Sequence, residues 1–450
     1  MSATPDLALD GMTLIMGLGK SGLSAVRTLL ALGADVAVTD TRLAPPGLAE
    51  LQHQYPQVRC YLGGFPPTVV ARAARLLVSP GVSLQMPVIA AAAARGVPVW
   101  GDIELFACLA RAPVAAITGS NGKSTVTTLL GLMAEQAGVR VAVGGNLGTP
   151  ALELLACPMT DLYVLELSSF QLESTYSLNA RVATVLNISP DHLDRHASLA
   201  AYTQAKQRIF QGNGSIVINA DDPVVSAMAE PGRQVLRFTL AEPAAGEFGL
   251  RCRAGGLWLA HGEDDWLAAE ELQLRGAHNL ANALASLAMG YVLGLERNAM
   301  LAALRTFTGL PHRTQLVLER AGVRWYDDSK GTNVGATVAA VNGLPEPLVL
   351  IAGGDGKGQD FTPLGAALAP RVRALVLLGR DAPAIAAAVG DRVPVHWARD
   401  MAQAVTLAAQ LARPGDSVLL SPACASLDMF SNYEERGTVF AAEVRRQLAC

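Results

Sequence analysis

The chain has 450 residues, of which 51% are hydrophobic and 16% charged, and its formal net charge is −4. A chain this apolar buries enough surface to offset the entropy lost on folding, which excludes an intrinsically disordered protein. At ~100 to 200 residues per domain, we expect two to four domains. The mild negative charge gives no electrostatic footprint for duplex nucleic acid, so any anionic partner must be held locally.

The sequence contains no candidate membrane span and no secretory signal. No apolar run reaches the ~18 residues that a transmembrane helix needs. The start, MSATPDLALDG, is acidic, whereas a secretory signal begins with a basic region. We therefore expect a cytoplasmic protein without nucleic-acid or membrane partners, and nothing in the sequence requires more than a monomer.

Short β-branched segments alternate with Ala- and Leu-rich helical segments along the chain. This alternation is typical of parallel sheets covered by helices, in which ligands bind at the carboxyl ends of strands. The stretch 235–274 is more irregular, with several glycines and two tryptophans, and predicts an antiparallel excursion. The expected strands are residues 13–16, 37–39, 76–79, 115–118, 162–167, 182–188, 215–219, 348–352, 374–378 and 417–420.

Three α/β domains are expected. A βαβ unit begins at Thr13, a second Gly-rich strand-to-helix turn begins at Thr118, and a third group of strands follows Gly309-Leu310-Pro311. We predict a Rossmann-like N-terminal domain over residues 1–101, a central P-loop ATPase-type α/β domain over 102–309, and a C-terminal Rossmann-like α/β domain over 310–450.

The first glycine turn, Gly17-Leu18-Gly19-Lys20-Ser21-Gly22, fits the G-x-G-x-x-G pattern. It follows a predicted strand and opens a helix, and Asp40 follows after about 20 residues, near the position of a ribose-binding acid. Backbone amides and a helix N-terminus could approach a diphosphate there. For this motif alone, a nicotinamide site and a tight turn needed only for packing both stay open.

The second glycine turn has the composition of a phosphate-binding loop. A hydrophobic strand leads into Gly119-Ser120-Asn121-Gly122-Lys123-Ser124-Thr125, and a helix is expected to start near Thr125. Backbone N–H groups of such a loop cradle phosphates, with Lys123 reaching the outer phosphates and Ser124 available to Mg²⁺. Ile117 stands where the standard Walker motif has its first glycine, so this is the shorter G-x-x-G-K-S form.

Charged groups follow the next two strands. Glu166 ends the strand 162–167 and would hold Mg²⁺, which prefers a few hard oxygen ligands. Residues 187–196 (NISPDHLDRH) form either a solvated turn or a site for a second Mg²⁺ or phosphate charge, with His192 as the ligand. Lys206, on a helix just beyond, is predicted from spacing alone to be an ordinary surface lysine.

Five later clusters combine glycine or proline with charged or amide side chains at strand or helix ends. Each alone could be a capped turn, but together, downstream of a phosphate loop, they indicate a ligand site between domains. The clusters are residues 276–282, 310–313, 327–333, 353–357 and 421–426.

At these residues the chain resembles the Mur ligase family, the ATP-dependent amide-bond ligases of peptidoglycan assembly. The resemblance runs from Gly17 to the NYEERG segment at 432–437. TGSNGKST marks the superfamily, whereas GLGKSG, VTDTR, LELSSFQLE, GLPHR, DDSKGTN and LLSPACASLDMF together are more specific and are similar to members that add D-glutamate. The resemblance implies a cytoplasmic ligase of cell wall biogenesis, linked to cell shape, cell division and the cell cycle.

The resemblance also implies substrates and site residues. The enzyme would join D-glutamate to UDP-N-acetylmuramoyl-L-alanine, using ATP and two Mg²⁺ ions, through an acyl phosphate and a tetrahedral intermediate. The UDP-sugar would contact Gly17, Gly19, Ser21, Gly22, Asp40, Thr41, Arg42, Asn146 and Ser168. ATP would contact residues 119–125, Asn279, Asn282, Arg313 and Asp328. D-Glutamate would contact Asp191, Lys330, Thr332, Lys357, Ser426 and Tyr433, and the C-terminal domain that binds it would close on ATP. Metal ligands would be Ser124, Glu166, His192 and, if carbamylated, Lys206, and the catalytic groups Lys123, Asp191, His192 and Lys206.

Two positions depart from the family pattern: Tyr433 stands where phenylalanine is expected, and Gly331 where alanine is common. Two other functions stay open. A folylpolyglutamate-type ligase shares the phosphate loop and chemistry but not the GLGKSG and VTDTR segments. A non-catalytic nucleotide sensor would leave the DSKGTN and SPACAS clusters without a role.

Overall fold

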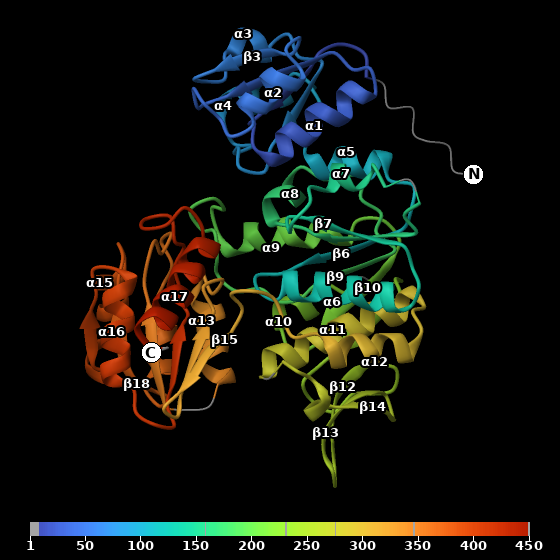
Figure 1. Ribbon diagram of the computed structural model, residues 1–450. Helices are drawn as coiled ribbons and strands as arrows, with labels where there is room; N and C mark the ends of the chain where they lie inside the picture. The colour runs from blue at the N-terminus through green and yellow to red at the C-terminus, as the bar shows by residue number, and fades with distance from the viewer. Residues whose placement is uncertain (1–8, 158, 230–231, 275, 345–346, 449–450) are drawn as a thin grey trace.

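The computed structural model describes residues 9–157, 159–229, 232–274, 276–344 and 347–448. Three sheets, each accompanied by helices, follow one another along the chain (Figure 1). The predicted α/β class with three parts is confirmed by this arrangement. The division after residues 101 and 309 stays a prediction. No helix in the described ranges is long and apolar enough to cross a bilayer.

The N-terminal sheet is parallel, with strand order β3-β2-β1-β4-β5. Because β1 pairs with β2 on one side and β4 on the other, the glycine turn after β1 lies at the point where the strand order reverses. The strands are β1 (Thr13–Met16), β2 (Val36–Asp40), β3 (Arg59–Leu62), β4 (Arg75–Val78) and β5 (Val99–Trp100). The helices are α1 (Lys20–Ala31), α2 (Leu48–Gln54), α3 (Pro67–Val70) and α4 (Pro87–Ala94).

The central sheet has the order β14-β13-β12-β11-β10-β9-β6-β8-β7. Strands β6 to β11 are parallel, and β11 also pairs parallel with β12, whereas β12, β13 and β14 pair antiparallel with one another. The antiparallel excursion predicted for residues 235–274 is thus found in these three strands but not in β11, at its start. The strands are β6 (Val114–Thr118), β7 (Val141–Gly145), β8 (Leu162–Glu166), β9 (Val182–Val185), β10 (Ser215–Asn219), β11 (Val235–Phe238), β12 (Phe248–Arg253), β13 (Gly256–His261) and β14 (Asp264–Ala268). The helices are α5 (Asp102–Leu109), α6 (Lys123–Gln136), α7 (Ala151–Leu154), α8 (Ser169–Glu173), α9 (Leu199–Gln207), α10 (Pro223–Ser226), α11 (Ala277–Leu293) and α12 (Arg297–Thr306).

The C-terminal sheet has the order β15-β16-β20-β17-β18-β19, in which only the edge pair β15–β16 is antiparallel among the described strands. The strands are β15 (Gln315–Arg320), β16 (Val323–Asp327), β17 (Leu348–Ala352), β18 (Val372–Leu377), β19 (Val395–Trp397) and β20 (Ser417–Leu420). The helices are α13 (Val334–Gly343), α14 (Thr362–Leu368), α15 (Ala382–Val389), α16 (Met401–Leu411) and α17 (Tyr433–Leu448).

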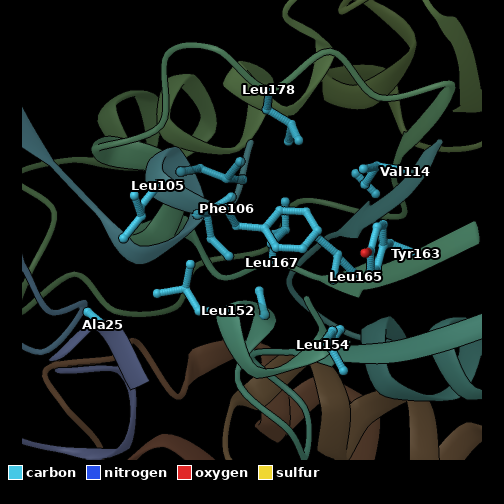
Figure 2. Packing of buried hydrophobic residues seen from close by; sticks show 14 of the residues in the cluster. Ala25, Leu105, Phe106, Val114, Leu152, Leu154, Tyr163, Leu165, Leu167 and Leu178 are labelled. Atoms are coloured by element: carbon cyan, nitrogen blue, oxygen red, sulfur yellow. The ribbon is translucent and has the colours of Figure 1, made fainter. Parts of the chain in front are cut away.

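One apolar core runs through both the N-terminal and the central part of the chain. It contains Ala25 and Leu29 of α1 together with Phe106 of α5 and Leu152 of α7 (Figure 2). The ring of Phe106 meets the ring of Tyr163 edge-on, with centroids 5.1 Å apart. The C-terminal sheet packs into two clusters of its own, one on each face. The first two sheets are therefore joined by hydrophobic burial and the third is a separate body.

Candidate functional site

The phosphate loop connects β6 to α6 and is held from the neighbouring strand by Asn187. The Asn187 carbonyl accepts from the backbone N–H of Ser120 at 2.9 Å, and its side-chain oxygen accepts from that of Asn121 at 2.8 Å. Gly122 has a φ of 84°, and a Cβ there would lie 2.4 Å from Asn282 Oδ1, so the position requires glycine. This turn lets α6 begin at Lys123, two residues before the predicted start.

Lys123 folds back over its own loop. Its Nζ donates to the carbonyls of Gly119 and Ser120, both at 2.9 Å. Burial lowers the pKa of Lys123, and the nearby carboxylates of Glu166 and Asp191 oppose that shift. The loop thus holds an ammonium group at its centre, where the phosphates of a bound nucleotide would lie.

Glu166 and Ser124 form a pair of hard oxygen donors beside this lysine. Glu166 Oε1 accepts from Asn146 Nδ2 at 2.6 Å, whereas Oε2 is buried without a hydrogen-bond partner among the described residues. Burial acts to raise the pKa of Glu166, but the charges of Lys123 and Arg313 and the hydrogen bonds from Ser124 and Asn146 together outweigh it, and the pKa lies below its ordinary value. The buried, ionised carboxylate of Glu166, with one oxygen left without a hydrogen bond among the described residues, and the nearby Ser124 hydroxyl are suitable ligands for Mg²⁺.

No group of three or more His, Cys, Asp or Glu side chains that could hold a metal by itself occurs in the part of the chain that the structure describes. Mg²⁺ commonly binds through one or two protein oxygens, substrate phosphates and water. The donor set around Glu166 therefore suits a metal that arrives with a nucleotide.

The loop after β9 carries Asp191 and His192 into the same space. Asp191 is buried, and its carboxylate lies 3.5 Å from Lys357 Nζ and 3.7 Å from His192 Nε2. Both His192 and Lys357 have positive φ values, 55° and 50°, an uncommon backbone state that clusters at functional sites. Burial lowers the pKa of His192 to about 4, so its imidazole is neutral near pH 7 and able to ligate a metal.

Lys206 is not a surface residue, so the expectation drawn from its spacing is wrong. Its side chain is 2% exposed and approaches the phosphate loop from α9. Its Nζ donates to the Gly119 carbonyl at 2.8 Å and to Thr118 Oγ1 at 3.3 Å, and it lies over the Tyr202 ring at 4.7 Å. Burial and the charge of Lys123 lower its pKa well below the ordinary lysine value.

Residues of the C-terminal part complete the site from the opposite side. Arg313 donates to Ser124 Oγ at 2.9 Å. Asn333 exchanges two amide hydrogen bonds with Asn121, at 3.4 and 3.2 Å, and donates to Asp191 Oδ2 at 3.1 Å. These contacts bring the C-terminal sheet against the phosphate loop.

Three adjoining pockets collect most of the residues singled out in the sequence. A pocket of about 860 Å³ between α11, the phosphate loop and α13 contains the residues expected to bind nucleotide, namely Asn121, Gly122, Thr125, Asn279, Asn282, Arg313 and Asp328. A second, of about 920 Å³, is lined by Ser120, Lys123, Ser124, Glu166, Ser168, Asp191, His192, Lys206, Lys330, Thr332 and Tyr433, among others. Gly119, the first residue of the loop, lines neither pocket, and its carbonyl accepts hydrogen bonds from Lys123 and Lys206.

The third pocket, of about 1730 Å³, opens at the first glycine turn and reaches Ser124 and Glu166. Its lining includes Gly17, Gly19, Ser21, Asp40, Thr41, Arg42 and Asn146. Asp40 accepts from Leu18 N and from the Arg42 backbone and guanidinium, and Arg42 is the main reason that the pKa of Asp40 falls to about 2. Much of the hydrogen-bonding capacity of the Asp40 carboxylate is thus used within the turn.

Besides Gly119, three of the expected residues lie outside the lining of these pockets. Gly22 packs so closely on the glycine turn that a Cβ would lie 2.0 Å from the Gly17 carbonyl oxygen, so it serves backbone packing. Ser426 is buried, and its carbonyl accepts from the backbone N–H of Met429 and Phe430. Lys357 reaches the site through Asp191.

Several residues that build the site were not predicted as site residues from the sequence. Asn187 and Asn333 stand within motifs that were noted, but their bonds to the phosphate loop become visible only in three dimensions. Tyr202, whose hydroxyl lies 3.1 Å from Ser120 Oγ, has no signal in the sequence. Phe170 lies within LELSSFQLE and meets the His192 ring edge-on at 4.8 Å.

Comparison with known proteins agrees along nearly the whole chain. The family descriptions "Mur ligase MurD-like, N-terminal domain", "Mur ligase middle domain" and "Mur ligase, glutamate ligase domain" match residues 11–101, 117–290 and 312–424. UDP-N-acetylmuramoylalanine–D-glutamate ligases of Nitrosococcus oceani and Pseudomonas syringae are 57% and 55% identical, covering 97% of this chain and 97% and 98% of theirs. A pseudomurein peptide ligase type C from Methanothermus fervidus shares the fold, with a TM-score of 0.61 at 18% identity over 98% of this chain and all of that one.

Proposed function

The chain belongs to the Mur ligase family, and we propose that it is the ligase that joins D-glutamate to UDP-N-acetylmuramoyl-L-alanine with consumption of ATP in peptidoglycan precursor synthesis. The observation that carries this proposal is the pocket in which Lys123 and Glu166 from the central sheet face Lys330 and Thr332 from the C-terminal sheet. Relatives at 55–57% identity with that activity support it.

ATP is proposed to activate the acceptor. A carboxylate does not react with an amine at a useful rate because its oxygen is a poor leaving group, so the carboxylate of the L-alanyl group attacks the γ-phosphate of ATP and forms an acyl phosphate and ADP. Lys123 offsets the charge on the transferred phosphoryl group, and such preorganised electrostatics is usually the largest catalytic contribution. Ser124 and Glu166 would hold Mg²⁺, which would supply further positive charge at the phosphates.

D-Glutamate is proposed to bind where the C-terminal part meets Asp191. Lys330 and Lys357 provide two positive charges for its two carboxylates, and Thr332 a hydroxyl. The ring of Tyr433 lies 3.8 Å from Lys330 Nζ and orients that ammonium. The amine attacks the acyl carbon, phosphate leaves, and the proton of the amine passes to Asp191 or His192. Ser426 does not line this pocket and would act by supporting the backbone around it.

Lys206 is proposed to be carbamylated and, together with His192, to hold a second Mg²⁺. Only a neutral amine adds to CO₂, releasing one proton and leaving an anionic carbamate. Burial, which lowers the pKa of Lys206, favours that neutral form. Incubation with ¹³C-bicarbonate should therefore give a carbamate carbon signal that is absent from Lys206→Arg. A wild-type enzyme without this signal at full activity would contradict the modification.

The large N-terminal pocket is proposed to hold the UDP-sugar, with the glycine turn at its diphosphate and Asn146 and Ser168 near the muramoyl group. The pocket of about 860 Å³ would hold the adenosine of ATP between Asn279, Asn282 and Asp328. These pockets need no residue from a second subunit, and we propose a monomer. A cytoplasmic location and the absence of nucleic-acid or membrane partners follow from the proposed substrates.

Phosphate release with ATP, Mg²⁺, UDP-N-acetylmuramoyl-L-alanine and D-glutamate tests the function. We expect release only when both acceptor substrates are present, and none when L-glutamate replaces D-glutamate. Release with L-glutamate alone would overturn the substrate, and release with a folate in place of the UDP-sugar would favour a folylpolyglutamate-type ligase. ATP binding without any ADP formation would instead indicate a nucleotide sensor.

A further inference from the structure

Arg195 connects the loop that carries Asp191 and His192 to the N-terminal part of the chain. Its guanidinium donates to the backbone carbonyl of Val82 at 3.2 Å and to Glu173 Oε2 at 2.9 Å. The side chain is only 15% exposed, so these bonds lie largely out of water. The proposed chemistry leaves this arginine without a role.

The same guanidinium covers a ring that touches His192. Its central carbon lies 5.3 Å from the centre of the Phe170 ring, within the range of a cation–π contact. The Phe170 ring meets His192 edge-on at 4.8 Å and stacks on His196 at 5.6 Å. Arg195 therefore holds the aromatic surface against which His192, in its uncommon left-handed backbone state, is packed.

Val82 ends a short turn that belongs to the N-terminal pocket. The backbone N–H of Val82 donates to the Ser79 carbonyl at 2.9 Å, and Ser79 Oγ donates to the carbonyl of Gly17 at 2.8 Å. Residues 79–82 and the glycine turn together line the pocket of about 1730 Å³. A ligand in that pocket can therefore contact the turn whose Val82 carbonyl accepts a hydrogen bond from Arg195.

We propose that Arg195 is a positioning residue that couples occupancy of the UDP-sugar pocket to the geometry of the Asp191–His192 loop. Arginine suits this task because its planar guanidinium donates to the Val82 carbonyl and the Glu173 carboxylate while it lies over the Phe170 ring. Ordering of residues 79–82 by the UDP-sugar holds the Val82 carbonyl in place, Arg195 transmits this to Phe170, and His192 is set for the phosphates of ATP. The inference rests on the proposed function and deepens it.

The coupling has a measurable form. A ligand can favour binding at a second site only through a coupling free energy, which is reciprocal and typically corresponds to about a 5- to 150-fold change in affinity. We expect UDP-N-acetylmuramoyl-L-alanine to tighten the binding of Mg²⁺ and a non-hydrolysable ATP analogue by a factor in this range. In Arg195→Met, which keeps the aliphatic stem but removes both donors, we expect that factor to fall to about one.

Isothermal titration calorimetry of the analogue, with and without saturating UDP-sugar, measures the factor in each protein. Arg208→Met is the matched control: Arg208 also donates to two carbonyls, those of Leu172 and Thr175, and covers the Tyr176 ring, but these partners all belong to the central part of the chain. We expect Arg208→Met to keep the wild-type factor. If Arg195→Met does not fold, Arg195→Gln, which is too short to span to Val82, carries the same test.

Three results would overturn the inference: an uncoupled wild type, a coupled Arg195→Met, or a loss of coupling in Arg208→Met equal to that in Arg195→Met. A purely structural role would lower thermal stability without changing the ratio of the two affinities. Failure of the proposed function is a separate outcome, because it would appear as a wild type that neither binds the UDP-sugar nor releases phosphate with D-glutamate.

Discussion

Asn333 connects the C-terminal part to both the phosphate loop and Asp191, and its replacement by aspartate gives a sharp prediction. The residue is 3% exposed, and its Nδ2 donates to Asp191 Oδ2 at 3.1 Å while its Oδ1 caps α13 by accepting from Ala336 N at 2.8 Å. Aspartate is as good an N-cap as asparagine, so Asn333→Asp keeps the helix start. It replaces the donor with an anionic oxygen that faces Asp191.

The size of the effect follows from that distance. Two unit charges 3.1 Å apart repel by about 5 kcal/mol at an effective dielectric constant of ~20. Protonating one of the two carboxyl groups at pH 7 costs less, about 4 kcal/mol for an ordinary aspartate pKa. The closed state, in which the C-terminal part contacts Asp191 through residue 333, therefore takes up a proton, and its population relative to the wild type falls by roughly 10³ at pH 7.

The sign of the pH dependence follows from the bound proton. The carboxyl pair has a raised pKa in the closed contact and an ordinary pKa when the C-terminal part moves away. Closing therefore binds a proton, and the penalty shrinks by about 1.4 kcal/mol for each pH unit below 7, until about pH 4. The variant should recover relative to the wild type as the pH falls.

The assay is D-glutamate-dependent ADP release, expressed as the ratio of kcat/KM in the variant to that in the wild type between about pH 5.5 and pH 7.5. Asn333→Ser keeps a cap without adding charge, and should lose about 1.5 to 3 kcal/mol at every pH, because it removes a hydrogen bond to a charged group. An aspartate variant within about tenfold of the wild type at pH 7, or one whose ratio to the serine variant does not change with pH, would refute the reasoning.

Three further predictions concern single side chains. Lys123→Ala should lower phosphate release by at least about 100-fold while circular dichroism stays unchanged, because its Nζ donates to carbonyls of its own loop; substantial residual turnover would exclude a phosphate-binding role. Burial raises the pKa of Asp328 to about 7, so the folded state binds a proton that the unfolded state has lost. The free energy of unfolding should therefore fall by up to about 1.4 kcal/mol per pH unit as the pH rises from about 4 to about 7. Urea titrations of Asp328→Asn should lack this part of the pH dependence, and an unchanged pH dependence in the variant would contradict the prediction. Tyr433→Phe keeps the ring beside Lys330 and should leave the KM for D-glutamate within about threefold, whereas Tyr433→Leu should raise it by about tenfold; equal effects would show that the ring does not orient Lys330.

Local patterns in the sequence predicted the parts of the site that are built locally. The phosphate loop was identified because a buried strand, two glycines, a lysine and two hydroxyls must be adjacent in the chain to cradle phosphates. Glu166 was identified because it ends a strand in a chain that also has a phosphate loop; without that loop it would have been predicted to be a surface glutamate. In both cases the residues that matter lie within one strand–turn–helix unit.

Residues that act through tertiary packing left no such pattern. Lys206 lies on α9, a helix of mixed composition, and only the tertiary fold, in which α9 packs on α8, brings its ammonium to the Gly119 carbonyl. The contact between Asn333 and Asn121 spans 212 positions in the chain and depends on how two sheets dock. The prediction of Asp40 as a nucleotide contact stays open, because its strongest partner in the structure is Arg42 of its own turn.

The apolar core shared by the first two sheets determines how the protein divides when it unfolds. Phe106 and Leu152 are buried partly by residues of α1, so removing residues 9–101 would uncover them, and each large apolar side chain exposed costs about 1.5 to 3 kcal/mol. The C-terminal sheet has a complete core of its own and meets the rest mainly through polar contacts. The first two sheets therefore form one large cooperative folding unit, and the C-terminal sheet forms a smaller one. A fragment ending near residue 309 should fold by itself, whereas a fragment beginning near residue 102 should not.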